Sequence, residues 1–154
     1  MLAILVGHRF GVVTTMPSAV APIEHSLAAA GLDSRSVGVR AAQIPVLDAA
    51  TDLVATAEAL AVHGRELVAA GADVLVLGCA GFAGLDLLVE NLTGVPAIDG
   101  VAAAVTLCEA LVSLGKTTSK AGPYATPSAT KRRPGWPISV ASARVDATEG
   151  AQHA

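Results

Sequence analysis

Aromatic and charged side chains are both scarce in this chain of 154 residues, at 3% and 15% of the composition. With so few large rings, the core must be built from close contacts between small aliphatic side chains of helices and strands. The chain can form such a core, because 53% of its residues are hydrophobic and it is long enough for one domain. The net charge of −3 and the isoelectric point of about 5.7 provide no basic surface for nucleic acid.

Long apolar runs and targeting signals are also missing. The mean hydropathy is high, at +0.59, but the uncharged apolar run over residues 74–85 is far shorter than the roughly 20 residues of a membrane-spanning helix. Residues 1–7 have no basic start and no cleavage pattern, so no secretory signal is expected. The two cysteines, Cys79 and Cys108, lie in unlike sequence contexts and do not indicate a disulfide scaffold. We therefore expect a cytoplasmic protein with no membrane partner.

The most informative segment is the run Val74–Leu77 together with the residues Gly78-Cys79-Ala80-Gly81 that follow it. A short run of valine and leucine is typical of a strand that is buried on both faces of a parallel sheet. The glycines after it let the backbone turn sharply and approach a ligand closely. Because open α/β sheets bind their ligands at the carboxyl ends of the strands, Cys79 is expected where a ligand would bind.

Cys79 has two interpretations. A free cysteine often only fills space in a core, and Cys108, which lies within a helical pattern of apolar residues, is expected to do so. By contrast, a helix predicted to follow Gly84 would direct its free N–H groups at Cys79, and the positive end of its dipole would favour a thiolate. A small carboxylate or amide could bind to those N–H groups.

A strand followed by a helix occurs four times along the sequence. The strands are predicted over residues 9–15, 36–40, 74–77 and 95–98. This order predicts an α/β domain with a single four-stranded, mostly parallel sheet and helices on both faces.

The composition changes at Thr117. From there on proline, serine and threonine are frequent, and a basic run occupies residues 131–133. Such a composition is typical of a disordered tail. We therefore divide the chain into an α/β domain over residues 1–116 and a tail over residues 117–154.

Several other side chains have specific expected places. Ser18 is expected to cap the second helix, and Leu53 to lie on the buried stripe of the longest helix. Arg40, at a strand end, could hold a substrate, but an ion pair with a carboxylate such as Asp48 is the preferred interpretation. Asp99 follows the last strand and could either cap the next helix or point into the crevice at the strand ends.

Thr14 and Thr15 end the first predicted strand. Hydroxyl groups at that position commonly hydrogen-bond nearby backbone, and spacing alone favours this interpretation. The alternative is that both hydroxyls donate hydrogen bonds into the same crevice as Cys79.

Three kinds of chemistry are compatible with the glycine-rich turn. The first is nucleotide binding, because Gly78, Gly81 and Gly84 follow a strand and open a helix. Their spacing is G-x-x-G-x-x-G, however, whereas a dinucleotide fingerprint requires G-x-G-x-x-G. The second is a cysteine hydrolase, which needs a histidine base beside the thiol. His8, His25 and His63 are available, but none falls predictably at a strand end.

The third is proton transfer at a carbon next to a carbonyl group. It needs a base and hydrogen-bond donors for the enolate oxygen that develops. A thiolate beside glycine-rich N–H groups provides both. Inverting the configuration at that carbon also needs a second group on the opposite face to return the proton.

The third possibility agrees with a resemblance to a known family. The matching segments are Gly7–Thr15, Val39–Arg40 with Ile44–Leu47, Gly78–Gly81, Gly94–Gly100 and Thr118–Lys120. In this order and spacing, over about residues 2–124, they resemble the hydantoin and allantoin racemases of the aspartate/glutamate racemase superfamily.

The resemblance implies a cofactor-independent, metal-free isomerase that acts on 5-substituted hydantoins, allantoin or related amino-acid derivatives. Cys79 would be its proton-transfer residue, and Gly78, Ala80 and Gly81 would shape the pocket. Thr14 and Thr15 would hydrogen-bond the substrate. These racemases are built from two similar α/β halves that each contribute one cysteine.

The matching segments all correspond to the second half of such a racemase, and the first half is not expected in this chain. Cys108 lies in the middle of a helix and cannot replace the first-half cysteine. A separate first-half chain or a second copy could complete the site, or the domain could be an inactive remnant. One-cysteine chemistry like that of the arylmalonate decarboxylases is a further alternative.

Overall fold

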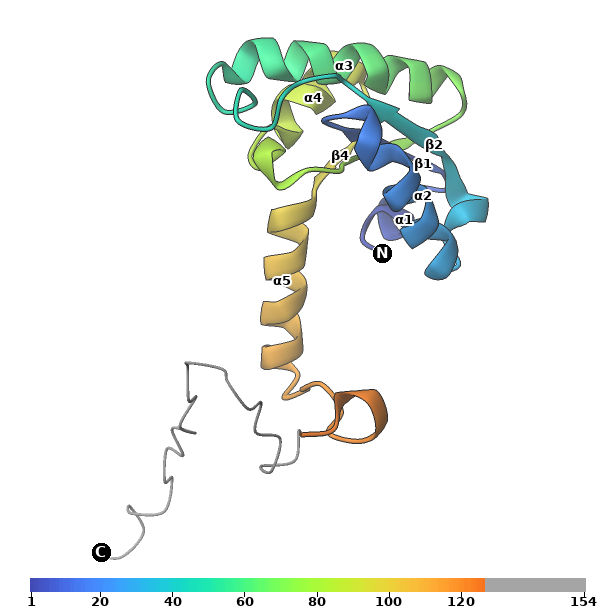
Figure 1. The fold of residues 1–154 in the computed structure, drawn as a ribbon, viewed down its shortest axis with the longest axis vertical. Coiled ribbons are helices and arrows are strands. Elements are labelled where there is room, and N and C mark those ends of the chain that lie inside the picture. The colour runs from blue at the N-terminus through green and yellow to red at the C-terminus, as the bar shows by residue number, and fades with distance from the viewer. Residues whose placement is uncertain (127–154) are drawn as a thin grey trace, which may run out of the picture. The chain divides into compact units, whose positions relative to one another are not determined.

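The computed structural model describes residues 1–126 (Figure 1). Contacts within the chain divide it into two units, with the boundary between Lys116 and Thr117. The first unit contains the sheet and the α-helices. In the second unit, residues 117–126 include one short 3-10 helix, η4 (Gly122–Tyr124). The remainder of the predicted disordered tail lies outside the described residues.

Four strands form one sheet. They are β1 (Phe10–Thr14), β2 (Ser36–Ala41), β3 (Val74–Leu77) and β4 (Ala97–Asp99). Their spatial order is β2-β1-β3-β4, and every neighbouring pair is parallel. Parallel neighbours need a crossover connection, which the strand–helix repeat of the sequence supplies. The predicted four-stranded parallel sheet is therefore confirmed.

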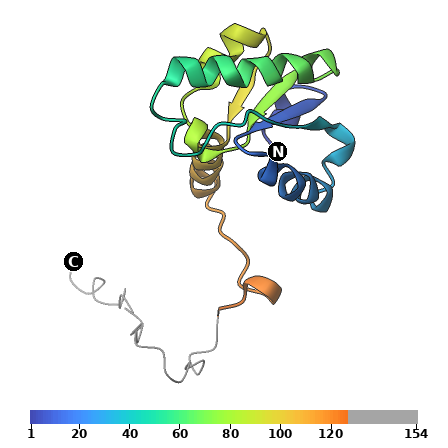
Figure 2. The same cartoon turned by 45° about the horizontal axis from the view of Figure 1, so that its top comes forward.

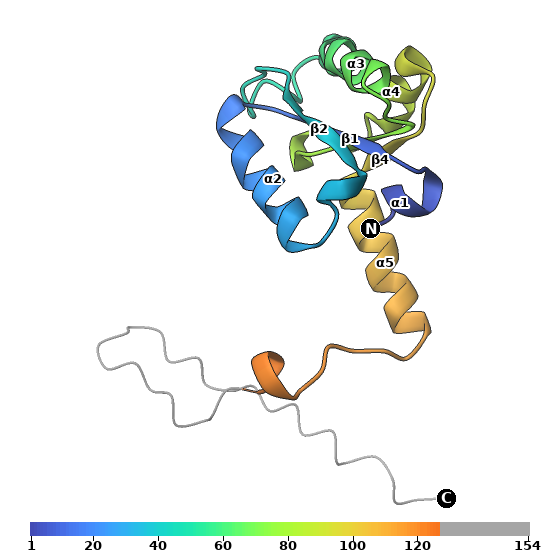
Figure 3. The ribbon, with the colours of Figure 1, turned by 90° about the vertical axis from the view of Figure 1, so that its right-hand side faces the viewer.

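Five α-helices occur in the described part of the chain. They are α1 (Ala3–Val6), α2 (Val20–Ala29), α3 (Leu53–Ala69), α4 (Asp86–Thr93) and α5 (Gly100–Ser113). Helices α3 and α4 cover one face of the sheet, and α1 and α2 lie on the other (Figures 1 and 3). This confirms the prediction of helices on both faces and explains why the central strands are apolar on both sides.

The core consists of two clusters, one on each face of the sheet. Val13 and Leu75 belong to the cluster that includes the buried residues of α3 and α4. Val12 and Val74 belong to the other cluster, against which α1 and α2 pack. Neighbouring residues of each strand thus enter different clusters, because successive side chains of a strand point to opposite faces.

Helix α3 packs very closely on the sheet at two glycines. A Cβ atom at Gly11 of β1 would lie only 2.7 Å from the Cβ of Leu67. A Cβ atom at Gly64 of α3 would lie 2.8 Å from the Cδ1 of Leu75. This close approach brings small aliphatic side chains into contact, as a core with few aromatic residues requires.

Three local predictions are wrong. Ser18 does not cap α2, because it lies within the 3-10 helix η1 (Pro17–Ala19) and α2 begins without a side-chain cap. Leu53 is 50% exposed, because the buried face of α3 starts further along the helix. The fourth strand is shorter than predicted and begins at Ala97, since Pro96 has no N–H group to donate to the ladder.

The prediction that Cys108 belongs to the core is also wrong. Cys108 is exposed on α5, a helix of 14 residues whose main contacts with the sheet are made through β4 (Figures 1 and 2). Other apolar residues of this helix are exposed as well, including Leu111 at 51% and Val112 at 77%. A helix that is apolar on all sides is normally buried, but no other element within residues 1–116 covers most of α5. No helix in this part of the chain is long and apolar enough to cross a membrane.

Asp73 connects the start of β3 to the segment before β1. Its two carboxylate oxygens accept the backbone N–H groups of His8 and Arg9, each at 2.8 Å. These hydrogen bonds, of which the one from His8 has the larger effect, hold the pKa of Asp73 below its ordinary value of 3.8. The folded state therefore favours the ionised carboxylate.

We predict that Gly11→Ala destabilises the domain by about 1–3 kcal/mol, because the new methyl group pushes α3 away from β1. The measurement is urea-induced unfolding followed by circular dichroism. Gly100→Ala is the matched control, since its nearest atom would be the Leu77 carbonyl oxygen at an ordinary 3.5 Å. Equal stability of the two variants would show that α3 is not held tightly against the strand.

We predict that Asp73→Asn lowers stability near neutral pH and that its difference from the wild type shrinks below pH 3.8. The folded-state pKa of Asp73 is depressed, so its contribution is complete above the unfolded-state pKa and is lost as the pH falls through the folded-state value. Urea unfolding at a series of pH values measures this difference. A difference that stays constant from about pH 7 to about pH 3 would contradict the prediction.

Candidate functional site

The parallel register brings three chain segments together at the carboxyl edge of the sheet. Leu77 of β3 pairs with Val13 of β1 on one side and with Asp99 of β4 on the other. The residues that follow these strands are therefore neighbours, although they are far apart in the sequence. Thr14, Cys79 and Asp99 all lie at or just beyond this edge, as the strand ends predict.

Cys79 is partly exposed and begins a tight turn. It precedes the 3-10 helix η3 (Ala80–Phe82), and its carbonyl oxygen accepts the N–H group of Phe82 at 3.1 Å. The side chain of Phe82 is completely buried and anchors the turn in the core. Cys79 itself packs against the edge of the same core cluster. Cys79 therefore rests on the core and is partly exposed.

Gly78 fixes the backbone directly before the cysteine. Its N–H group donates to the carbonyl of Val13 at 2.8 Å, and its own carbonyl accepts the hydroxyl of Thr14 at 3.5 Å. A Cβ atom at Gly78 would lie 2.7 Å from the Cγ1 of Val12. This position therefore needs glycine because β1 lies so close to the turn.

Thr14 and Thr15 are almost completely buried, at 1% and 4% exposure. Their carbonyl oxygens accept the N–H groups of Ala42 and Ile44, at 2.8 and 3.2 Å. They thus hold the loop after β2 against the end of β1. The hydrogen bond of the Thr14 hydroxyl to Gly78 agrees with the preferred interpretation from the sequence, in which strand-end hydroxyls bind nearby backbone.

Gly81 lies between the cysteine and the loop after β2. A Cβ atom at this position would be 3.7 Å from each of three atoms, which are the Sγ of Cys79, the carbonyl oxygen of Val46 and the Cβ of Ala49. These are ordinary contact distances. The loop after β2 therefore forms one wall beside Cys79, and Gly81 leaves space there.

The short helix predicted after Gly84 is present, since α4 begins at Asp86. The 3-10 helix η3 lies between it and Cys79 and was not predicted. The N–H groups of Ala80 and Gly81 precede the first hydrogen bond of η3, so they have no partner within that helix. The donors beside the thiol thus belong to a single short turn.

Asp99 binds two different segments. One carboxylate oxygen accepts the N–H groups of Val101 and Ala102, at 2.7 and 3.3 Å, and so caps α5, which is one of the two alternatives that the sequence left open. The other oxygen accepts the N–H group of Gly84 at 2.9 Å. Burial raises the pKa of this carboxyl, but the hydrogen bonds from Gly84, Val101 and Ala102 outweigh that effect, and the pKa lies below its ordinary value.

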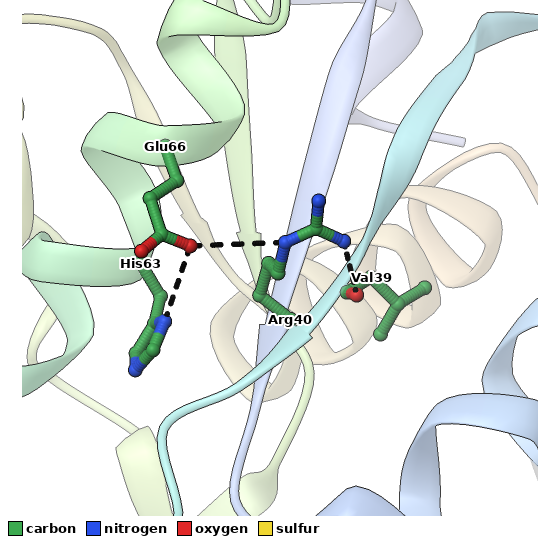
Figure 4. A network of polar contacts seen from close by, with 4 residues as sticks. All are labelled: Val39, Arg40, His63 and Glu66. Carbon is green, nitrogen blue, oxygen red and sulfur yellow. Dashed lines mark hydrogen bonds and ion pairs between the residues drawn. The ribbon is translucent and has the colours of Figure 1, made fainter.

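Arg40 forms the ion pair expected of it, but with a different carboxylate. Its Nε lies 3.7 Å from the Oε2 of Glu66 on α3 (Figure 4). The partner is therefore Glu66 and not Asp48. The same oxygen lies 3.4 Å from the Nδ1 of His63. The side chains of Arg40 and Glu66 are about half exposed, so this network contributes little to stability.

None of the three candidate histidines forms a hydrogen bond to Cys79 in the described structure. His63 contacts Glu66, and His25 is exposed on α2. His8 precedes β1 and lies at the amino end of that strand, opposite the edge that carries the cysteine. Within residues 1–126, no three His, Cys, Asp or Glu side chains gather closely enough to hold a metal ion.

The fold and the site together define a parallel α/β domain with a partly exposed cysteine just beyond the carboxyl end of β3. The chain belongs to the Asp/Glu/hydantoin racemase family, whose model matches residues 1–108. The matched residues include the sheet, the Cys79 turn and more than half of α5.

Several relatives are similar over most of the chain. The hydantoin racemase of Rhizobium meliloti is 41% identical over 128 residues, which cover 82% of this chain and 53% of that protein. The hydantoin racemase of Pseudomonas sp. (strain NS671) is 38% identical over 127 residues, which cover 82% and 51%. The crystal structure of allantoin racemase from Pseudomonas fluorescens matches with a TM-score of 0.80 at 44% identity, over 86% of this chain and 57% of that one. The chain thus spans about half the length of the curated relatives that it matches.

We predict that Gly78→Ala lowers the free energy of unfolding by about 1–3 kcal/mol, because its methyl group would overlap Val12. Gly81→Ala serves as the control and is expected to change stability by no more than about 0.5 kcal/mol. Thermal unfolding of both variants measures the difference. A Gly78→Ala protein as stable as the control would mean that the backbone before Cys79 is not confined by β1.

Proposed function

We propose that this domain is the second, cysteine-bearing half of a cofactor-independent racemase for 5-substituted hydantoins, allantoin or related amino-acid derivatives. The proposal rests on the position of Cys79, a partly exposed residue in a hydrogen-bonded turn at the carboxyl edge of the sheet. Membership of the Asp/Glu/hydantoin racemase family and the names of the relatives support the substrate class.

In the proposed reaction, the thiolate Sγ of Cys79 takes the proton from the ring carbon beside a carbonyl group. The electron pair of the C–H bond passes into an enolate, and negative charge develops on the carbonyl oxygen. The N–H groups of Ala80 and Gly81 are the donors proposed for that oxygen. The thiol then returns a proton to the carbon, and the thiolate is restored. The step needs no electron transfer and no co-substrate.

The remaining pocket residues are proposed to act through shape and hydrogen bonding. Gly78 and Gly81 would keep the space around the thiol free of side chains. Thr14 and Thr15 are proposed to hydrogen-bond the substrate. For Thr14 this requires its hydroxyl to leave the Gly78 carbonyl, which is a small cost because that hydrogen bond, at 3.5 Å, is long.

Racemisation needs a second proton donor on the opposite face of the carbon, and we propose that another polypeptide supplies it. Cys108 lies on α5, a different element from the turn that holds Cys79. The exposed apolar side chains of α5 support a partner, which could be a first-half chain or a second copy of this domain. Alone, the domain would exchange a proton on one face only.

We predict that the protein incorporates solvent deuterium at C5 of an enantiopure 5-substituted hydantoin and that Cys79→Ser abolishes this incorporation. Proton NMR measures the exchange, and chiral chromatography measures the configuration of the product. Cys108→Ser is the matched control and should retain the full exchange rate, because Cys108 is exposed on α5.

The possible results distinguish one-face exchange, completion of the site by a second copy, and an inactive remnant. Exchange with retained configuration indicates one working face, whereas inversion whose specific rate rises with protein concentration indicates completion by a second copy. A folded protein that exchanges nothing, alone or mixed with a racemase first half, contradicts the proposal and leaves an inactive remnant. Exchange that persists in Cys79→Ser would exclude Cys79 as the base.

A further inference from the structure

The carboxylate of Asp99 connects two elements that belong to different parts of the chain. It caps α5 through Val101 and Ala102, and it also holds the N–H group of Gly84, which is 15 residues away in the sequence. Gly84 ends the turn that starts at Cys79. Its φ angle of +80° is readily adopted only by glycine.

The Cys79 turn is attached to both neighbouring strands and to the core, and Asp99 supplies its hydrogen bond to the end of β4. At the start, the N–H group of Gly78 donates to Val13 and its carbonyl accepts the hydroxyl of Thr14, both in β1. In the middle, the side chain of Phe82 is buried in the core. At the end, no hydrogen bond other than that to Asp99 is found for the N–H group of Gly84 within the described residues. Leu85, the next residue, is buried in the core, and its N–H group donates to the carbonyl of Phe82 at 3.1 Å. Loss of the bond to Asp99 would therefore loosen Gly84 while these contacts remain.

A helix cap alone does not require this arrangement, as the other acidic cap of the chain shows. Asp52 caps α3 by accepting the N–H group of Ala55 at 3.0 Å, and no second segment binds its carboxylate in the described structure. Asp99 makes the same kind of cap with one oxygen and uses its other oxygen for Gly84. Both oxygens are good acceptors because hydrogen bonds to an ionised carboxylate are the strong ones.

We propose that Asp99 is a positioning residue that fastens the end of the Cys79 turn and thereby sets the place and accessibility of the thiol. Asp99 acts through Gly84 and need not contact a substrate. An effect of Asp99 on catalysis would depend on the proposed function of Cys79. Its effect on the position of the Cys79 turn does not depend on that function.

The test compares Asp99→Ser with Asp52→Ser, both in a Cys108→Ser background in which Cys79 is the remaining thiol. Serine is a good helix cap, so both variants keep their helices, but the short side chain at position 99 cannot cap α5 and reach Gly84 at once. Hydrogen exchange by NMR reports on the N–H group of Gly84, and the rate of alkylation by iodoacetamide reports on Cys79. Asp99→Asn is a second variant, because its amide oxygen can cap α5 while its amide nitrogen cannot accept a hydrogen bond.

We expect Asp99→Ser to speed exchange at Gly84 by at least about tenfold, since a hydrogen bond to a charged group is lost. Alkylation of Cys79 should rise by at least about threefold as the turn opens more often. Asp52→Ser should leave both rates within about twofold of the background protein. Unchanged exchange at Gly84, or faster exchange there with unchanged alkylation of Cys79, would overturn the proposal.

A substrate measurement separates this inference from the proposed function. If the parent protein exchanges deuterium at C5 of a hydantoin, Asp99→Ser should lower kcat more than it changes KM, whereas Asp52→Ser should alter neither. If the parent protein exchanges nothing, the proposed function fails, and the amide and alkylation rates still decide the role of Asp99.

Discussion

Parallel pairing of β3 with β1 on one side and β4 on the other is the interaction on which the rest of the structure depends. It aligns Val13, Leu77 and Asp99 across the sheet, so that the three chain segments that follow come together at one edge. Hydrogen bonds between these segments then give the edge its form. Gly78 is bound to β1, and Gly84 is bound to Asp99 at the end of β4. The cysteine lies between these two attachments.

Small residues make this tight arrangement possible. The chain has few aromatic side chains, and α3 approaches the sheet so closely that Gly11 and Gly64 have no space for a methyl group. Phe82 is a large residue within the Cys79 turn, and its ring is fully buried. The one large side chain of this region thus anchors the segment that most needs a fixed position, and the glycines around it keep the surface above open.

Helix α5 carries many exposed apolar side chains. Its sequence is apolar on nearly every side, yet its residues are largely exposed among the described residues. The chain also spans about half the length of its curated relatives, and the family match extends into α5. Asp99 is the residue where that helix and the Cys79 turn meet, so the two are mechanically connected.

The sequence by itself determined the fold class, the strand order along the chain and the position of Cys79 at a strand end. These follow from local properties, because runs of β-branched residues, helical periodicity and glycine placement act over a few residues. The cap at Asp99 could be predicted for the same reason, whereas Ser18 failed because a proline beside it formed a 3-10 turn instead.

Only the tertiary structure decided what depends on contacts between distant segments. Gly84 and Asp99 are joined by a hydrogen bond, and Arg40 selects Glu66 rather than Asp48, because the folded backbone sets which partners are within reach. Cys108 shows the same limit most clearly. Apolar periodicity predicts that a helix face is buried. Whether it is buried depends on which surfaces the rest of the fold places against that face.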